Sequence, residues 1–260
     1  MTSYLRKGSG TPVVLVHGLG SRWECYEPVI DILAEQHDVI AVDLPGFGDT
    51  PLASGVEPGA RGYARWLTDF LAELEVSDPH VVGNSMGGGV ALEMGRAGAA
   101  ARVTAFSPIG FWEMPGRIWT QALLTGLRQG GQLAEPVLAR LVQVPALKAV
   151  LVSSMMNPRR VSPDDALRHA DGLIRAEGFP AARNSFSHYT LREDDAQGSL
   201  TDIPVTIAWG TRDVVLTHRT QSARARRFMP FARHVDLPRC GHVPFSDDPG
   251  LCARVILGEA

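Results

Sequence analysis

Cysteine is scarce in this sequence, with only Cys25, Cys240 and Cys252 among 260 residues. The three are far apart, odd in number and without the paired spacing of a zinc site or a disulfide framework. We therefore expect buried free thiols in a reducing compartment, with no bound metal.

An excess of charge of one sign is also missing. Lys and Arg number 25 against 28 Asp and Glu, a formal net charge of −3, which argues against a nucleic-acid or membrane-surface partner. The most apolar stretch, near 141–156, is interrupted by Gln143, Pro145 and Lys148, so it predicts no membrane span. The opening residues "MTSYLRKGSG" contain no apolar region of a secretory signal. We therefore expect a cytoplasmic protein.

Short apolar runs alternate with helical patterns along much of the chain. Six runs predict strands, mostly as continuous apolar stretches typical of a parallel sheet covered on both faces: "PVVLVHG" from Pro12, "DVIAVDL" from Asp38, "HVVGNS" from His80, "RVTAFS" from Arg102, "PVTIAWG" from Pro204 and "RHVDL" from Arg233. "SYLRK" from Ser3 predicts a shorter edge strand.

Helices are predicted between these runs. The strongest pattern lies over 60–74, a second helix should follow Ser85, and others fit 26–36, 218–228 and 249–258. Strand and helix in repeated alternation indicate an α/β fold with a doubly wound, mostly parallel sheet. Residues 111–200 contain amphipathic helical pieces but no convincing strand. We therefore predict a core of 1–110 and 201–260, with a helical insertion over 111–200 between two strands.

The stretch "VVGNSMGGGVAL" places Ser85 between glycines, where a strand ends and a helix begins. A Gly-x-Ser-x-Gly pattern in this context is typical of a sharp, strained turn that exposes the serine hydroxyl at the carboxyl end of a strand. The alternative is a glycine-rich turn with an incidental serine. We interpret Ser85 as a nucleophile.

A serine hydroxyl needs a base, and the base needs a carboxylate that fixes its tautomer. His242 follows the last predicted strand within "RCGHVPF", and Asp213 closes the strand that begins at Pro204. Both should lie at the sheet edge that carries Ser85. We interpret His242 as the base and Asp213 as its carboxylate partner.

Acyl transfer also needs hydrogen-bond donors for the developing oxyanion. The N–H of Met86, directly after the serine, is one candidate, and the N–H of Leu19 in the loop "HGLG" is the other. We expect His17 to brace that loop through hydrogen bonds and Asp43 to hold the turn "DLPGFGDT".

Together these motifs resemble the α/β-hydrolase superfamily across nearly the whole chain. "VLVHGLG" is similar to its oxyanion loop, "DLPGFGDT" to its Asp-x-Pro-Gly-x-Gly turn, "GNSMGG" to its nucleophile elbow, "WGTRDVV" to its acid turn and "CGHVPFSDDP" to its histidine loop. The order Ser85, Asp213, His242 is the order of that superfamily. The resemblance implies that 111–200 is a cap over the active site. The short N-terminus implies a sheet of at most seven strands that lacks the first strand of the family.

The resemblance implies a serine hydrolase that needs no cofactor and cleaves carboxylic esters of small to medium, largely apolar molecules through an acyl-enzyme. The predicted substrate contacts are Gly18, Phe111, Trp112, Trp119, Met155 and Val243.

Other activities use the same residues. "GNSMGG" is also frequent in carbon–carbon hydrolases of aromatic meta-cleavage products, which usually carry a tryptophan where this chain has Val243; Arg183 or Arg192 could bind the substrate carboxylate in such an enzyme. Thioesterase, lactonase and perhydrolase activities share the same three residues. A ligand-binding receptor built on this fold is the non-enzymatic alternative.

Overall fold

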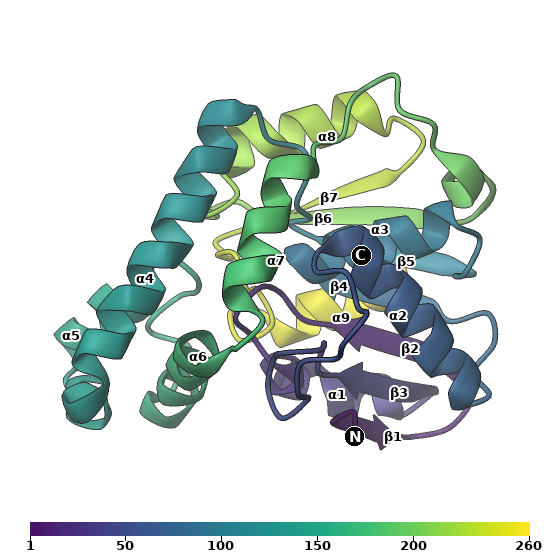
Figure 1. Ribbon diagram of the computed structural model, residues 1–260. Helices are drawn as coiled ribbons and strands as arrows, with labels where there is room; N and C mark the ends of the chain where they lie inside the picture. Colours follow the sequence, from purple (N-terminus) through teal and green to yellow (C-terminus); the bar gives the residue numbers. More distant parts are fainter.

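The computed structural model describes all 260 residues and is built around a seven-stranded sheet in the order β1-β3-β2-β4-β5-β6-β7 (Figure 1). Only β1 is antiparallel to its neighbour, and the other pairs are parallel. The strands are β1 (Tyr4–Lys7), β2 (Thr11–Val16), β3 (His37–Val42), β4 (His80–Asn84), β5 (Arg102–Phe106), β6 (Val205–Gly210) and β7 (Arg233–Leu237). The structure thus confirms the mostly parallel α/β sheet, including the edge strand at the N-terminus.

Helices cover both faces of the sheet, which explains why the strands read as continuous apolar runs. Within β2, Val14 and Val16 belong to one apolar core while Val13 and Leu15 belong to the other. The first core is closed by α2 (Ala60–Glu73), α3 (Met86–Arg96) and α8 (Ala223–Phe228). The second is closed by α1 (Glu27–Ala34) and α9 (Pro249–Leu257).

The predicted helices are present with small differences at their ends. The helix expected over 26–36 is α1, which follows a short 3₁₀ turn at Trp23–Tyr26. The helix expected over 218–228 begins as a π-helical turn at His218–Ser222 and continues as α8.

Between β5 and β6 the chain forms helices and no strand. These are α4 (Met114–Leu141), α5 (Pro145–Val152), α6 (Pro163–Arg175) and α7 (Phe179–Ser185), followed by 3₁₀ turns at Phe186–His188 and Gly198–Asp202. The helix α4 runs through Pro136, a residue that would ordinarily be expected to interrupt it. In Figure 1, α4, α5 and α6 stand to one side of the sheet. None of the helices combines the length and the apolar character needed to cross a bilayer.

Candidate active site

Ser85 occupies the turn between β4 and α3 with a strained backbone. Its φ of 57° and ψ of −114° lie in a region that non-glycine residues rarely adopt. The neighbouring glycines make this turn possible. A Cβ on Gly83 would overlap the carbonyl of Gly87, and a Cβ on Gly87 would overlap the carbonyl of Val16. The sequence therefore folds into a turn that places the serine at the carboxyl edge of the sheet and at the N-terminus of α3.

His242 and Asp213 meet at the same edge of the sheet. The Nδ1 atom of His242 lies 2.8 Å from Oδ2 of Asp213, and both residues are buried. The other carboxylate oxygen, Oδ1, accepts hydrogen bonds from the backbone N–H groups of Val215 and Leu216, each at 2.9 Å. These two donors fix the plane of the carboxylate. Since Nδ1 donates to Asp213, the free Nε2 of His242 is left as a proton acceptor.

Ser85 and His242 line one cavity, but Ser85 Oγ makes no hydrogen bond to the ring in the structure. Hydrogen bonds between a nucleophile and its base often tighten only when substrate binds. The arrangement is therefore compatible with a serine activated by a histidine.

Two backbone N–H groups beside Ser85 have no acceptor in the chain. Neither Leu19 nor Met86, the first residue of α3, donates its N–H to a protein group. The loop that carries Leu19 passes close to the serine, because a Cβ built on Gly18 would lie 3.6 Å from Ser85 Oγ. N–H groups without an acceptor near a nucleophile are available to hydrogen-bond an oxyanion.

His17 braces this loop as expected from the sequence. Its Nδ1 donates to the carbonyl of Gly18 at 2.8 Å, and its Nε2 accepts the N–H of Leu44 at 3.0 Å. Burial lowers the pKa of His17 below its usual value, so the ring is neutral, with one donor and one acceptor. The carboxylate of Asp43 likewise holds its turn by accepting the N–H groups of Trp23, at 2.8 Å, and Asp49, at 3.1 Å.

Asn84 contributes a contact that sequence reasoning missed. Its side-chain nitrogen donates to the carbonyl of His242 at 2.9 Å and to that of Phe106 at 3.2 Å. It therefore ties the histidine loop to the strand beside the serine. The position of Asn84 directly before Ser85 in "GNSMGG" could have drawn attention to it. The sequence around Asn84 does not indicate, however, that its partner lies 158 positions away.

The histidine loop is also attached to the inserted helices. The Val243 N–H donates to the Met155 carbonyl at 2.8 Å. Asp247 accepts the N–H of Gly241 with one oxygen and the N–H of Asn157 with the other, both at 2.7 Å. Asp247 is thus a structural link between the core and the insertion.

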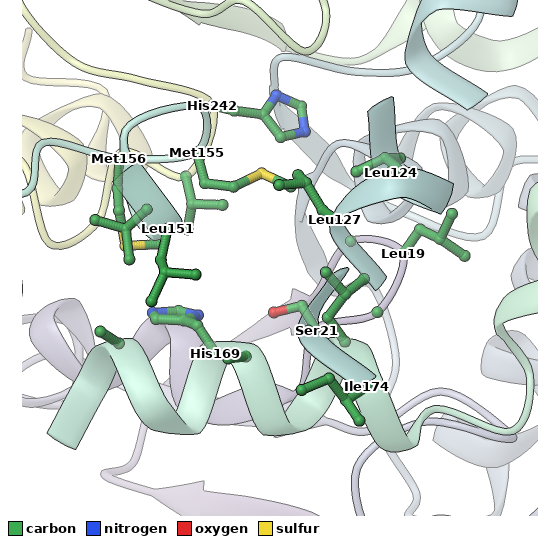
Figure 2. Close-up of a pocket in the computed structure, with 18 of the residues that line it drawn as sticks. Leu19, Ser21, Leu124, Leu127, Leu151, Met155, Met156, His169, Ile174 and His242 are labelled. Atoms are coloured by element: carbon green, nitrogen blue, oxygen red, sulfur yellow. The ribbon is translucent and has the colours of Figure 1, made fainter. Parts of the chain in front are cut away.

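The cavity at Ser85 lies between the sheet edge and the inserted helices (Figure 2). Of its 22 lining residues, 14 are hydrophobic, and most of these come from α4, α5 and α6 and the segments between them. The lining residues are Gly18, Leu19, Gly20, Ser21, Asn84, Ser85, Leu124, Leu127, Gly131, Leu138, Val142, Leu151, Val152, Met155, Met156, Ala166, His169, Ala170, Leu173, Ile174, His242 and Val243. Such a cavity suits an apolar molecule with a polar reacting group.

The sequence-predicted contacts divide into two groups. Gly18, Met155 and Val243 line the cavity. Phe111, Trp112 and Trp119 do not, and this part of the prediction is corrected. The last three have other roles, since each packs or forms a hydrogen bond elsewhere.

The packing of these aromatic residues explains the correction. Phe111 is buried against Trp209 and Phe228 in the core. The indole N–H of Trp112 donates to a backbone carbonyl at 2.9 Å inside the protein. Trp119 is 50% exposed on the outer surface of α4, and its indole N–H donates to the carbonyl of Val214.

The three cysteines are buried free thiols. No group of three or more His, Cys, Asp or Glu side chains is arranged to hold a metal ion.

Comparison with known proteins identifies the family of the chain. Residues 13–255 match the alpha/beta hydrolase family. An uncharacterized protein of Mycobacterium tuberculosis is 29% identical over 259 residues, which cover 93% of this chain and 73% of the relative. A 2-hydroxy-6-oxo-2,4-heptadienoate hydrolase of Pseudomonas putida is 39% identical over 88 residues, covering 33% of this chain and 32% of the relative. The fold is similar to that of a thermophilic esterase from Thermogutta terrifontis, with a TM-score of 0.74 and 21% identity, covering 99% of this chain and 92% of that one. The match over nearly the whole chain shows that the protein belongs to the alpha/beta hydrolase family.

Proposed function

We propose that this chain is a serine hydrolase that cleaves carboxylic esters of small to medium, largely apolar molecules. In this proposal Ser85 is the nucleophile, His242 the general base and Asp213 the residue that orients the base. The observation that carries the proposal is the buried 2.8 Å contact between His242 and Asp213, beside a strained serine in a mostly apolar cavity.

The reaction follows from the hydrogen bonds at the site. Ser85 Oγ attacks the ester carbonyl carbon while Nε2 of His242 takes the hydroxyl proton, and Asp213 stabilises the resulting imidazolium. The N–H groups of Leu19 and Met86 stabilise the oxyanion. When the tetrahedral intermediate collapses, His242 gives its proton to the departing alcohol and the acyl group stays on Ser85. A water molecule, activated by His242, then attacks the acyl carbon, releasing the acid and the free serine.

We also propose that 111–200 acts as a cap that shapes substrate choice, over a core of 1–110 and 201–260. The helices α4, α5 and α6 supply much of the apolar lining of the cavity. Gly18, Met155 and Val243 are then the predicted contacts that remain beside the reacting group. Apolar walls of this kind favour an alkyl or aryl group on either side of the ester bond.

Carbon–carbon bond hydrolysis is the second candidate, favoured by the similarity to the 2-hydroxy-6-oxo-2,4-heptadienoate hydrolase. The lining of the cavity argues against it. Neither Arg183 nor Arg192 lines the cavity, so no arginine is placed to bind a substrate carboxylate there. Val243 lines it where the resemblance would place a tryptophan.

A p-nitrophenyl ester series from acetate to laurate tests the proposal, measured on the wild type, Ser85→Ala and Ser187→Ala. Ser187 is an exposed serine outside the cavity and serves as the matched control. We expect sustained turnover that peaks at one chain length, survives in Ser187→Ala and is lost in Ser85→Ala. No turnover, or activity that survives in Ser85→Ala, would contradict the esterase.

Matched thioesters, lactones and dienones in the same assay separate the alternative reactions. A single turnover with retained product would indicate a receptor instead of an enzyme.

A further inference from the structure

The cavity has a second polar region away from the candidate catalytic residues. Five of its lining residues carry polar side chains, and Asn84, Ser85 and His242 belong to the site described above. The other two are Ser21 and His169. Figure 2 shows the Ser21 hydroxyl and the His169 ring pointing into the cavity from the side opposite His242. A molecule that reacts at Ser85 and fills the cavity would therefore meet a second set of polar atoms.

His169 interrupts an apolar stripe of α6. The residues of this helix that line the cavity follow helical spacing, and apart from His169 they are Ala166, Ala170, Leu173 and Ile174. An imidazole in an apolar wall costs free energy unless it finds a hydrogen-bond partner. An aliphatic residue would satisfy packing at this position, so packing does not explain the histidine.

The His169 ring makes no hydrogen bond within the chain; the groups around it are Asp165 and Arg168, and burial lowers its pKa to about 4. The ring is therefore neutral near pH 7, with one nitrogen as a donor and the other as an acceptor. The Ser21 hydroxyl can also donate and accept, and it hydrogen-bonds the buried thiol of Cys25, which leaves it capacity for a second hydrogen bond. Both side chains can therefore form hydrogen bonds with a neutral polar group in the cavity.

Charges near this region are paired with one another. Arg168 forms ion pairs with Glu27, at 3.2 Å, and with Asp165. Arg22 pairs with Glu24 at 2.7 Å. A second, smaller pocket, lined by these side chains, adjoins the cavity at Ser21 and His169. Since no free cation faces the cavity here, an anionic group would find no counter-charge.

We infer that Ser21 and His169 form a specificity site for an uncharged oxygen-bearing group, a hydroxyl or a ketone, on the apolar part of the substrate. This inference rests on the proposed function, because it takes the ester substrate as the occupant of the cavity. The substrate would be an apolar ester that carries a neutral oxygen function at a distance from the reacting carbonyl.

Binding of matched esters to the Ser85→Ala protein tests this site without turnover. The probes are three p-nitrophenyl esters whose acyl chains have the same length and end in a methyl group, a methyl ketone or a carboxylate. Calorimetry gives the dissociation constant of each for Ser85→Ala alone and combined with His169→Phe, Ser21→Ala or His188→Phe. His188 is an exposed histidine of the inserted helices outside the cavity, so it is the matched control.

We expect the preference for the ketone-ended ester over the methyl-ended ester to fall about 3- to 10-fold in His169→Phe, since a neutral hydrogen bond is lost. Ser21→Ala should reduce it in the same direction, and His188→Phe should leave it unchanged. The carboxylate should bind more weakly than the ketone. An unchanged preference in both His169→Phe and Ser21→Ala, or tightest binding of the carboxylate, would overturn the inference.

The two proposals fail separately. Ser85→Ala binds without cleaving, so an absence of esterase activity in the wild type would remove the proposed function while the binding preference still reports on Ser21 and His169. Ser21→Ala removes a single oxygen atom and keeps the test decisive if His169→Phe does not fold.

Discussion

Replacing Asp213 by asparagine tests the geometry of the site because the backbone dictates how the new side chain must lie. Oδ1 of Asp213 accepts two N–H groups, from Val215 and Leu216. The amide oxygen of an asparagine would keep those bonds, which turns its NH₂ group toward Nδ1 of His242. An NH₂ group can only donate, so Nδ1 must become the acceptor and the ring proton moves to Nε2. The base is then in the wrong tautomer to take a proton from Ser85.

The expected effect is on turnover, with little effect on substrate affinity. The corresponding change in a Ser-His-Asp protease lowers kcat by about 10⁴-fold while the geometry is kept. We expect a fall of about 10³- to 10⁴-fold in kcat for the preferred p-nitrophenyl ester, with KM changed by less than about threefold. Steady-state kinetics measure both constants, and thermal unfolding verifies that the variant is folded.

Asp236→Asn is the matched control. Asp236 also contacts a histidine ring, Nε2 of His218 at 2.9 Å, but this pair lies on the surface of the protein. The same substitution there should leave kcat within about twofold, because surface pairs of this kind contribute little. Asp213→Asn with kcat within tenfold of the wild type would refute the assignment of Asp213 and the tautomer argument with it.

Three further predictions concern Gly87 in the turn at Ser85, the side chain of Asn84, and the dependence of stability on pH. Gly87→Ala should lower stability by about 1–3 kcal/mol or prevent folding, because the added Cβ overlaps the carbonyl of Val16; thermal unfolding measures this. Asn84→Leu removes the 2.9 Å bond to the His242 carbonyl and should cost about 1–3 kcal/mol while lowering kcat, and a kcat equal to that of the wild type would show that the bond does not position the histidine. Burial lowers the pKa of His80 from 6.5 to about 3, so the unfolded chain binds a proton that the folded chain excludes. Stability should therefore fall as the pH drops below about 6.5, and His80→Gln should flatten that dependence in urea unfolding curves.

The core elements and the elbow could be predicted because their signals are local. A strand buried on both faces reads as a nearly continuous apolar run, and in β6, where all six residues are buried, only Thr206 interrupts it. Gly83 and Gly87 are required by contacts within or directly beside the turn they flank. The meeting of Asp213 and His242 followed from topology, since parallel strands bring their carboxyl ends to one edge of the sheet.

The cavity lining could not be predicted in the same way because it depends on how the inserted helices rotate. An amphipathic helix shows which residues share a face, but the insertion has two apolar environments, the core and the cavity. Large aromatic residues were expected in the cavity, but Trp112 lies in the core and Trp119 lies on the outer surface. His169 was not singled out, since a histidine on a helix is usually exposed. Its position emerges only from the packing of α6 against α4, α5 and the loop after β2.

The contacts of the histidine loop limit how the insertion can move. Met155 and Asn157 form hydrogen bonds with Val243 and Asp247, which both lie in the histidine loop after His242. Moving the whole insertion as one rigid lid would break both bonds and leave a buried oxygen of Asp247 unpaired, at a cost of about 1–3 kcal/mol. Opening of the cavity therefore costs less free energy where it leaves these two hydrogen bonds in place. We expect the segment next to His242 to keep its position when substrate enters, and the helices on the other side of the cavity to make any movement that admission requires.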